Sequence, residues 1–223
     1  MIGKINYSNL QMSISGKNFD TINFSIYKKV ENNICTFWDE ITDLKIVDVV
    51  GYGKFEISLN KKTNQNILKE IVGQSLETEL SQIPLYDLHI NDDDYFNYGA
   101  QDESNLDSYG NIKPIKLYNP SDPHHSLLHL LLMDKACHWS LGVVPQYITV
   151  TNNGKQTQEL ATSFQRTFTI DGQNIYDFLV GDLANEANLI YIFDTYNRRI
   201  NIYDRYSIGE DTNDFINTRN LSS

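Results

Sequence analysis

The densest group of potential ligands and nucleophiles in this sequence runs from Ser121 to Trp139 and reads SDPHHSLLHLLLMDKACHW. Imidazole and thiolate groups are the ligands that Zn²⁺ prefers, and a thiol beside a base can act as a nucleophile. This stretch is therefore the first candidate for a metal or nucleophile site. Its candidate side chains are those of His124, His125, His129, Cys137 and His138.

Helical geometry separates most of these side chains. Pro123 favours the first turn of a helix capped by Ser121 or Asp122, and we expect that helix to continue to about His138. His125 and His129 are four residues apart and would share a face, whereas Cys137 and His138 would lie more than three turns beyond His125. Adjacent helical residues point about 100° apart, which disfavours a thiol and base pair at positions 137 and 138.

The alternative interpretation is a buried helix flanked by polar residues, because leucines occur on nearly every side of it. We favour that interpretation. We predict no catalytic residue, cofactor or metal, with the pair His125 and His129 as the residual metal candidates.

Other charged groups are explained equally well without a site. The acidic run Asp92 to Asp94, with Asp102, Glu103 and Asp107, could bind Ca²⁺ but lacks the EF-hand spacing, so we favour a solvated loop. Asp39, Glu40 and Asp43 are better explained as charges at strand ends than as a glycosidase pair. The turn at Arg198 and Arg199 could contact an acidic partner, although it fits the polar tip of a hairpin. Trp139 is expected in the core.

Composition excludes some classes of function. The chain has 223 residues and a net charge of −11, which argues against stable binding to phosphate backbones. The two cysteines, Cys35 and Cys137, are far apart and are interpreted as thiols in a reducing cell. The N-terminus lacks the apolar segment of a signal peptide, and no apolar run is long enough for a membrane anchor.

The first half shows strand periodicity. Ile22, Phe24 and Ile26 alternate with polar residues, and Gly51 and Gly53 mark a hairpin between two further apolar runs. A strand ending at Gly73, a short helix that is capped by Ser75 and continues to about Gln82, and a strand from Pro84 to Ile90 are expected next. Short strands at this density indicate a small antiparallel β-barrel or sandwich over residues 1–92.

The second half alternates strands and helices. Residues 93–120 read as an acidic linker, and residues 121–223 as an α+β domain. That domain should contain a hairpin around TNNGKQ, a strand from Phe164 to Ile170, a helix that begins near Asn174 and a second hairpin around Tyr196 to Arg198. The expected fold class is therefore β-rich α+β.

Two runs resemble a known family. LYNPSDPHHSLLHLLLMDKACHWSLGVV and FQRTFTIDGQNIYDFLVGDLANEANLIYIFDTYNRRINIYD are similar to the N-terminal hub region of tail-associated, or phage minor structural, proteins. These proteins belong to long-tailed phages of Gram-positive bacteria and are similar in fold to the baseplate hub of contractile tails. SISGKNFDTINFSIYK and IVGQSLETELSQIPL fit the same order of signals.

The resemblance implies a structural, non-enzymatic role as a virion protein of a phage or prophage tail tip. It implies a homotrimer, with tail-tube-like barrels, that continues the tail tube and forms a conduit for DNA. The partners would be distal tail or tube proteins and the tape measure, and the protein would be made in the bacterial cytoplasm. The chain would be either a fragment of a longer hub or a hub protein that natively lacks the further domains. Two alternatives stay open: a peptidoglycan hydrolase (endopeptidase), and a module that binds a receptor or carbohydrate.

Overall fold

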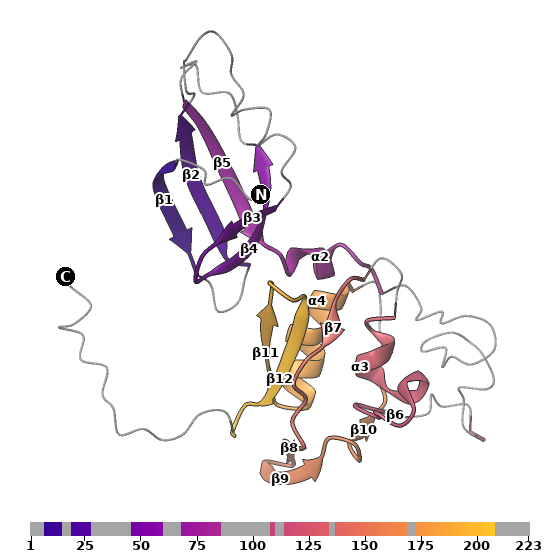
Figure 1. The fold of residues 1–223 in the computed structure, drawn as a ribbon. Coiled ribbons are helices and arrows are strands. Elements are labelled where there is room, and N and C mark those ends of the chain that lie inside the picture. The colour runs from indigo at the N-terminus through magenta and orange to yellow at the C-terminus, as the bar shows by residue number, and fades with distance from the viewer. Residues whose placement is uncertain are drawn as a thin grey trace, which may run out of the picture.

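The computed structural model describes residues 7–14, 19–27, 46–59, 68–85, 108–109, 114–133, 137–168 and 173–207. For residues 7–9, 26–27, 58–59 and 68–69 it describes the backbone alone. Strands predominate and helices are few, which confirms the expected β-rich α+β class. Figure 1 shows an N-terminal sheet above a second, larger unit.

The N-terminal sheet is antiparallel, with strand order β1-β2-β5-β4-β3. Its core contains Ile22 and Phe24, the alternating pair that the sequence indicated, together with Phe55 and Ile71. Gly51 and Gly53 have φ of +85° and +122° in the turn between the third and fourth strands, which confirms the expected hairpin. The strands are β1 (Tyr7–Ser13), β2 (Thr21–Tyr27), β3 (Ile46–Val49), β4 (Gly53–Leu59) and β5 (Leu68–Ser75).

This sheet is open within the part of the chain that the structure describes, since β1 and β3 form its two edges and do not pair with each other. No closed barrel is found among these residues. The strand predicted to end at Gly73 in fact continues to Ser75. Gly73 fits inside β5 because a Cβ there would lie 2.9 Å from Ile22 Cγ1, so the missing side chain lets Ile22 pack on the strand.

The segment after β5 joins the second unit. The short helix α2 (Thr78–Ser81) lies within the predicted range, although Ser75 does not cap it. Leu76 and Leu80 are fully buried and belong to the larger core, and residues 83 and 85 also pack there. Pro84 forms a bridge with Asn174, whereas residues 86–90 of the predicted strand lie outside the described residues.

We use "C-terminal unit" for residues 76–85 and 114–207 around that larger core. Figure 1 shows its helices beside the hairpin β11–β12. Its strands are β6 (Ile115–Lys116), β7 (Ser140–Leu141), β8 (Tyr147–Asn152), β9 (Lys155–Leu160), β10 (Gln165–Arg166), β11 (Leu189–Asp194) and β12 (Arg199–Asp204). Its helical segments are η2 (Pro123–His125), α3 (Leu127–Leu130), α4 (Ile175–Asp177), η3 (Phe178–Leu183) and α5 (Ala184–Glu186).

The continuous helix predicted from Pro123 to His138 was wrong. Ser126 is extended, with φ −128° and ψ 116°, and it separates the 3₁₀ turn η2 from α3. Ser126 bridges Lys116, and its Oγ accepts a hydrogen bond from Asn119 N at 3.1 Å. These contacts hold the backbone out of the helix, while the leucines beside it are buried as expected.

Three local predictions in the C-terminal unit are confirmed. The hairpin β8–β9 turns at Asn153 and Gly154, both with positive φ. Asn174 caps α4 by accepting a hydrogen bond from Asp177 N at 2.8 Å. The hairpin β11–β12 forms where the sequence placed it. The strand expected from Phe164 to Ile170 is shorter, because only Gln165 and Arg166 pair as β10, and residues 169–170 lie outside the described residues.

The domain division at residues 92 and 120 stays a prediction. Most of residues 93–113 lie outside the described part of the chain. The packing of residues 76–85 nevertheless places the end of the first predicted domain in the core of the second.

Candidate functional site: a joint between the two units

The turn between β11 and β12 contacts the N-terminal sheet on one side and α2 on the other. Asp194 Oδ1 accepts hydrogen bonds from the backbone N–H of Tyr196 at 3.1 Å and of Asn197 at 3.2 Å. Asn197 Nδ2 donates to Asp194 Oδ2 at 2.7 Å, and this bond lowers the pKa of Asp194 below its ordinary value. Arg198 closes the turn with φ +48°. The carboxylate therefore fixes the shape of the turn through contacts within the turn itself.

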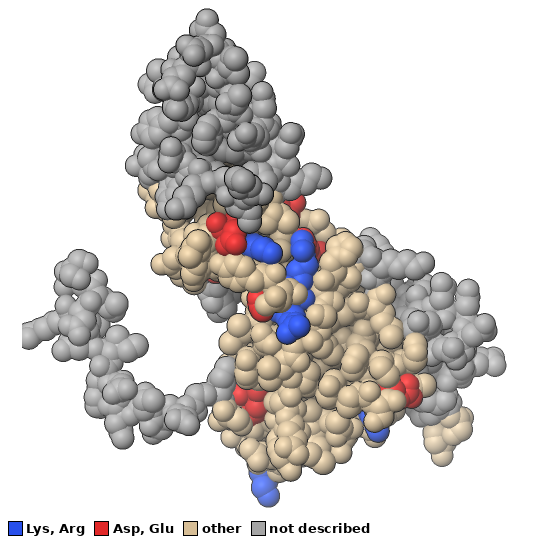
Figure 2. All heavy atoms as spheres, viewed as in Figure 1, with Lys and Arg blue, Asp and Glu red and all other residues tan. Residues whose placement is uncertain are grey.

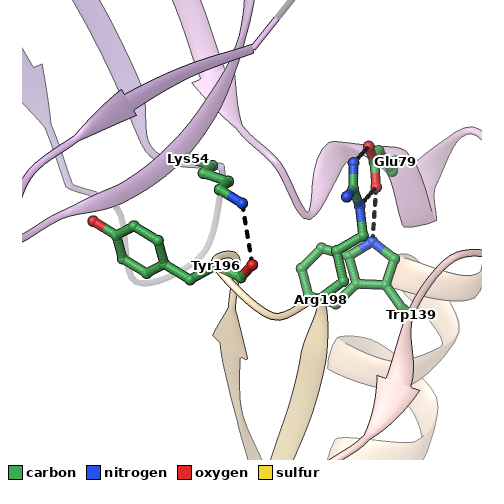
Figure 3. Close-up of polar contacts among 5 residues, drawn as sticks. All are labelled: Lys54, Glu79, Trp139, Tyr196 and Arg198. Atoms are coloured by element: carbon green, nitrogen blue, oxygen red, sulfur yellow. Dashed lines mark hydrogen bonds and ion pairs between the residues drawn. The ribbon is translucent and has the colours of Figure 1, made fainter. Parts of the chain in front are cut away.

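One side of this turn contacts the N-terminal sheet (Figure 3). Lys54 N donates to Thr195 Oγ1 at 2.9 Å, and Lys54 Nζ donates to the carbonyl oxygen of Tyr196 at 3.1 Å. Tyr196 Oη donates to the carbonyl oxygen of Val49 at 3.3 Å. The contacts reach both strands of the β3–β4 hairpin, so that hairpin is held against the C-terminal unit at its turn.

The other side of the turn contacts α2 (Figure 3). Arg198 Nη2 and Nε donate to Glu79 Oε1 and Oε2 at 2.8 and 2.9 Å, which makes a bidentate ion pair. Trp139 Nε1 donates to Glu79 Oε2 at 3.0 Å. The side chains of Arg198 and Glu79 are 30% and 25% exposed, so solvent screens the pair less than it would screen a pair at the open surface. We call Lys54, Glu79, Trp139, Thr195, Tyr196 and Arg198 the joint.

Charged side chains gather at this joint. Figure 2 shows acidic and basic groups side by side where the two units meet, whereas most of the described face below is neither acidic nor basic. The hydrogen bonds from Arg198 lower the pKa of Glu79, and the same bonds raise the pKa of Arg198. Both groups are therefore charged throughout the neutral range, and the ion pair does not exchange protons there.

Glu77, two residues earlier, has the opposite electrostatics. Burial raises its pKa above the ordinary value of 4.5, although Ser75 Oγ donates to Glu77 Oε1 at 2.6 Å. Among the described residues, Glu77 Oε2 is buried with no hydrogen-bond partner. Its negative charge is therefore a cost to the fold at neutral pH.

Replacing each glutamate with glutamine should have opposite effects on stability at pH 7. Glu79→Gln should lower the free energy of unfolding by about 1 kcal/mol, because the ion pair is lost. Glu77→Gln should raise it by about 0.5 kcal/mol, because a buried charge is removed. Urea unfolding of both variants beside the unchanged protein measures the two differences.

Acidification should reduce both differences, in different pH ranges. Because folding lowers the pKa of Glu79, its carboxylate stabilises the fold above about pH 4.5. This stabilisation is lost as the pH falls below that value. Because folding raises the pKa of Glu77, its negative charge destabilises the fold at neutral pH. This destabilisation begins to disappear as the pH falls through a value above 4.5, where the carboxyl group becomes protonated. Equal shifts for both variants at every pH would contradict this assignment.

The geometry suits positioning rather than chemistry. The carboxylate of Glu79 accepts hydrogen bonds from a guanidinium and an indole N–H, and among the described residues no hydroxyl or thiol hydrogen-bonds to it. What the joint does is hold the N-terminal sheet, α2 and the β11–β12 hairpin in one arrangement.

Each of the two residual metal candidates makes a polar contact with a neighbouring side chain through its Nδ1 atom. His125 Nδ1 lies 2.7 Å from Asp122 Oδ2, and His129 Nδ1 lies 2.7 Å from Ser126 Oγ. Because Ser126 breaks the helix, the two rings do not share one helical face. His129 instead stacks on Tyr118 with ring centroids 5.4 Å apart. Within the described part of the chain, no three His, Cys, Asp or Glu side chains come close enough to hold a metal ion.

The other candidates are dispersed. Cys137 is half-buried and His138 is exposed, outside any helix. Trp139 is 4% exposed and packs against Phe193, so its assignment to the core is confirmed. The acidic stretch at 92–107, the carboxylates at 39–43 and Cys35 lie outside the described residues.

One surface cavity, of about 280 Å³, lies at the base of the β8–β9 hairpin. Tyr147 and Tyr203 supply aromatic surface, and Gln146, Gln158 and Ser207 supply polar groups. This mixture of aromatic and amide side chains is chemically suited to a small polar ligand with an apolar face.

Sequence reasoning missed most of the joint. Arg198 was recognised as a hairpin residue, but its partner Glu79 is 119 positions away, and Lys54 contacts a residue 142 positions away. No local pattern encodes either pairing. The only local signal was the bulky aromatic residue at 139, which was correctly expected to be buried.

None of the helices in the described ranges has the length and apolar character needed to cross a bilayer. Comparisons of the chain with protein-family models, with curated proteins and with solved structures found no match.

Proposed function

We propose that the chain is a structural component of a phage or prophage tail tip or baseplate hub. In this role it is a virion protein that forms a homotrimer, continues the tail tube and surrounds the path of the DNA. The resemblance of the sequence runs 117–144 and 164–204 to tail hub proteins motivates the proposal. The β-rich α+β class is compatible with it.

The observation that carries the proposal is the joint. A subunit in the wall of a conduit must keep its parts at a fixed angle while neighbouring subunits bind to it. Here the hydrogen bonds of Lys54 join the two units, and the bidentate pair of Glu79 and Arg198 fixes α2, which directly follows the N-terminal sheet, on the same turn. A rigid two-part subunit is what a ring needs in order to close.

The charge of the chain supports the same role. A net charge of −11 gives a surface that repels phosphate groups, so DNA could pass without being retained. In the proposal the N-terminal sheet closes into a barrel that lines the channel. Residues 91–119 face distal tail proteins or the tape measure.

The oligomeric state tests the proposal. We expect light scattering to give three times the chain mass of 25.7 kDa, and cryo-electron microscopy to show a ring with an acidic or neutral bore. A strongly basic bore, or a monomer that clears purified cell walls in a zymogram, would instead favour another class. The second of these outcomes would point to the endopeptidase alternative.

A second candidate function is carbohydrate binding, which the cavity beside Tyr147 and Tyr203 favours. Aromatic rings stack on the apolar faces of sugars, while amide side chains bind their hydroxyl groups. A glycan array with the unchanged chain and with Tyr147→Ala would test it. Binding that Tyr147→Ala abolishes would support this function, and no binding to any glycan would exclude the sugars on the array.

A further inference from the structure

The strand β9 is an edge strand, since the sheet β8–β9 has two strands and β8 supplies its only described partner. Residues 155–158 of β9 are all exposed. In Figure 1 the hairpin lies at the end of the C-terminal unit that is remote from the N-terminal sheet. Backbone groups along such an edge are available to another strand.

The register identifies the backbone groups that face outward. Thr149 N donates to Asp204 Oδ1 at 2.6 Å, and Asn188 Nδ2 donates to the carbonyl oxygen of Thr149 at 2.7 Å. The backbone groups of Thr149 therefore point away from β9. Its cross-strand partner is Gln158, so the backbone groups of Gln158 point away from β8, and those of Gln156 do the same two residues along.

The sequence of this edge is complementary to itself. Residues 155–159 read KQTQE, with a lysine at one end, a glutamate at the other and Thr157 at the centre. If two copies pair antiparallel with Thr157 opposite Thr157, each Gln156 exchanges backbone hydrogen bonds with Gln158 of the other copy. Each Lys155 then lies opposite Glu159 of the other copy, and opposite charges at directly facing positions stabilise a strand pair.

Other registers lose this match. Moving one strand by two residues places each charge either opposite Thr157 or beyond the strand. A parallel arrangement places like charges opposite each other. The charge pattern thus favours one two-fold register over its neighbours.

We propose that β9 is a self-association edge, which pairs with β9 of a second copy of this chain in the register that centres on Thr157. The contact joins two β8–β9 hairpins into a four-stranded sheet. It does not rest on the proposed hub function, because a two-fold contact at β9 is separate from a three-fold ring contact. If both contacts form, the chain assembles in multiples of two and of three.

Cysteine cross-linking tests the register. In Thr157→Cys the two introduced cysteines lie directly opposite each other in a non-hydrogen-bonded pair. At such a position the Cα atoms are close enough for a disulfide to form. In the control Gln156→Cys the two Cα atoms lie about 8 Å apart, which is too far for one. Mild oxidation followed by trypsin and mass spectrometry gives a clean readout, because the peptide 156–166 contains no native cysteine.

We expect the linked 156–166 dimer peptide to be at least tenfold more abundant for Thr157→Cys than for Gln156→Cys. Equal yields, or none in either variant, would overturn the proposal. A monomeric mass for the unchanged chain at the concentration of the cross-linking experiment would also overturn the β9 contact, whereas the absence of a three-fold contact alone would bear on the hub function and leave the cross-link readout intact.

Charge exchange provides the second test. Lys155→Glu places Glu opposite Glu at both ends and should weaken self-association about tenfold, as measured by sedimentation. The double variant Lys155→Glu with Glu159→Lys restores both pairs and should return to within about threefold of the unchanged protein. A double variant as weak as the single one would contradict the assigned register.

Discussion

Replacing Asp204 with alanine is expected to lower the free energy of unfolding by about 3 kcal/mol. Asp204 is 2% exposed and accepts hydrogen bonds from Thr149 N at 2.6 Å, from Thr149 Oγ1 at 3.1 Å and from Ser207 Oγ at 2.5 Å. Alanine leaves the N–H of Thr149 buried without an acceptor. Because these bonds connect β12 to β8, we expect a single cooperative transition at lower urea concentration.

Two variants control for the loss of a carboxylate. Asp182 is exposed and accepts a hydrogen bond from Gln173 Nε2, so Asp182→Ala should change stability by less than about 0.5 kcal/mol. Asp204→Asn keeps one acceptor oxygen and should lie between alanine and the unchanged protein. Equal effects of Asp182→Ala and Asp204→Ala would show that the buried network contributes nothing of its own.

Replacing Gly53 with alanine should cost about 2 to 4 kcal/mol. Gly53 has φ of +122°, which strains any L residue, and an added Cβ would lie 2.5 Å from Thr195 Oγ1. The substitution therefore acts on the backbone and on the joint together. Gly51→Ala is the matched control, because Gly51 also has positive φ but a Cβ there would meet nothing within 4 Å.

The difference between these two glycine variants isolates the steric part of the effect. Thr195→Ala removes the hydroxyl that the new Cβ would meet, while the remaining Thr195 Cβ lies 3.8 Å away, at an ordinary contact distance. The double variant Gly53→Ala with Thr195→Ala should thus be more stable than the sum of the single effects predicts. Strict additivity in urea unfolding would show that Thr195 does not contact position 53.

Local chemistry predicted the hairpins of this fold and the start of the helix near Asn174, whereas the predicted caps at Ser75 and at Ser121 or Asp122 do not form. Asn153 and Gly154 adopt the positive φ values that their turn requires, and Asn174 accepts the hydrogen bond that caps α4. These signals lie within a few residues of the structure that they specify. They are therefore readable without knowledge of the fold.

The predicted helix from Pro123 to His138 was wrong for a non-local reason. Its leucine pattern gave the burial correctly but could not reveal that Ser126 pairs with β6. Helical periodicity reports which residues are buried, and a strand partner elsewhere in the chain can override the backbone conformation. The metal pair His125 and His129 depended on that helix and was separated with it.

The joint could not be predicted from the sequence for the same physical reason. Glu79 and Arg198 are oppositely charged residues among many, and only the packing of α2 against the β11–β12 hairpin makes them partners. Their separation of 119 residues means that no spacing rule applies. The fold class could be inferred from periodicity, whereas the site required the folded arrangement.

The two units are attached to each other at more than one place. One attachment is covalent, where β5 leads into α2, and another is the set of hydrogen bonds between the β3–β4 hairpin and the β11–β12 turn. A third is the ring contact of Phe19 with Tyr176, with centroids 4.5 Å apart. A body held at one point can swivel about it, whereas a body held at two points resists torsion. Twisting the N-terminal sheet about its connection would require the bonds of Lys54 and Tyr196 to break first. The β11–β12 turn therefore restricts twisting of the N-terminal sheet relative to the C-terminal unit.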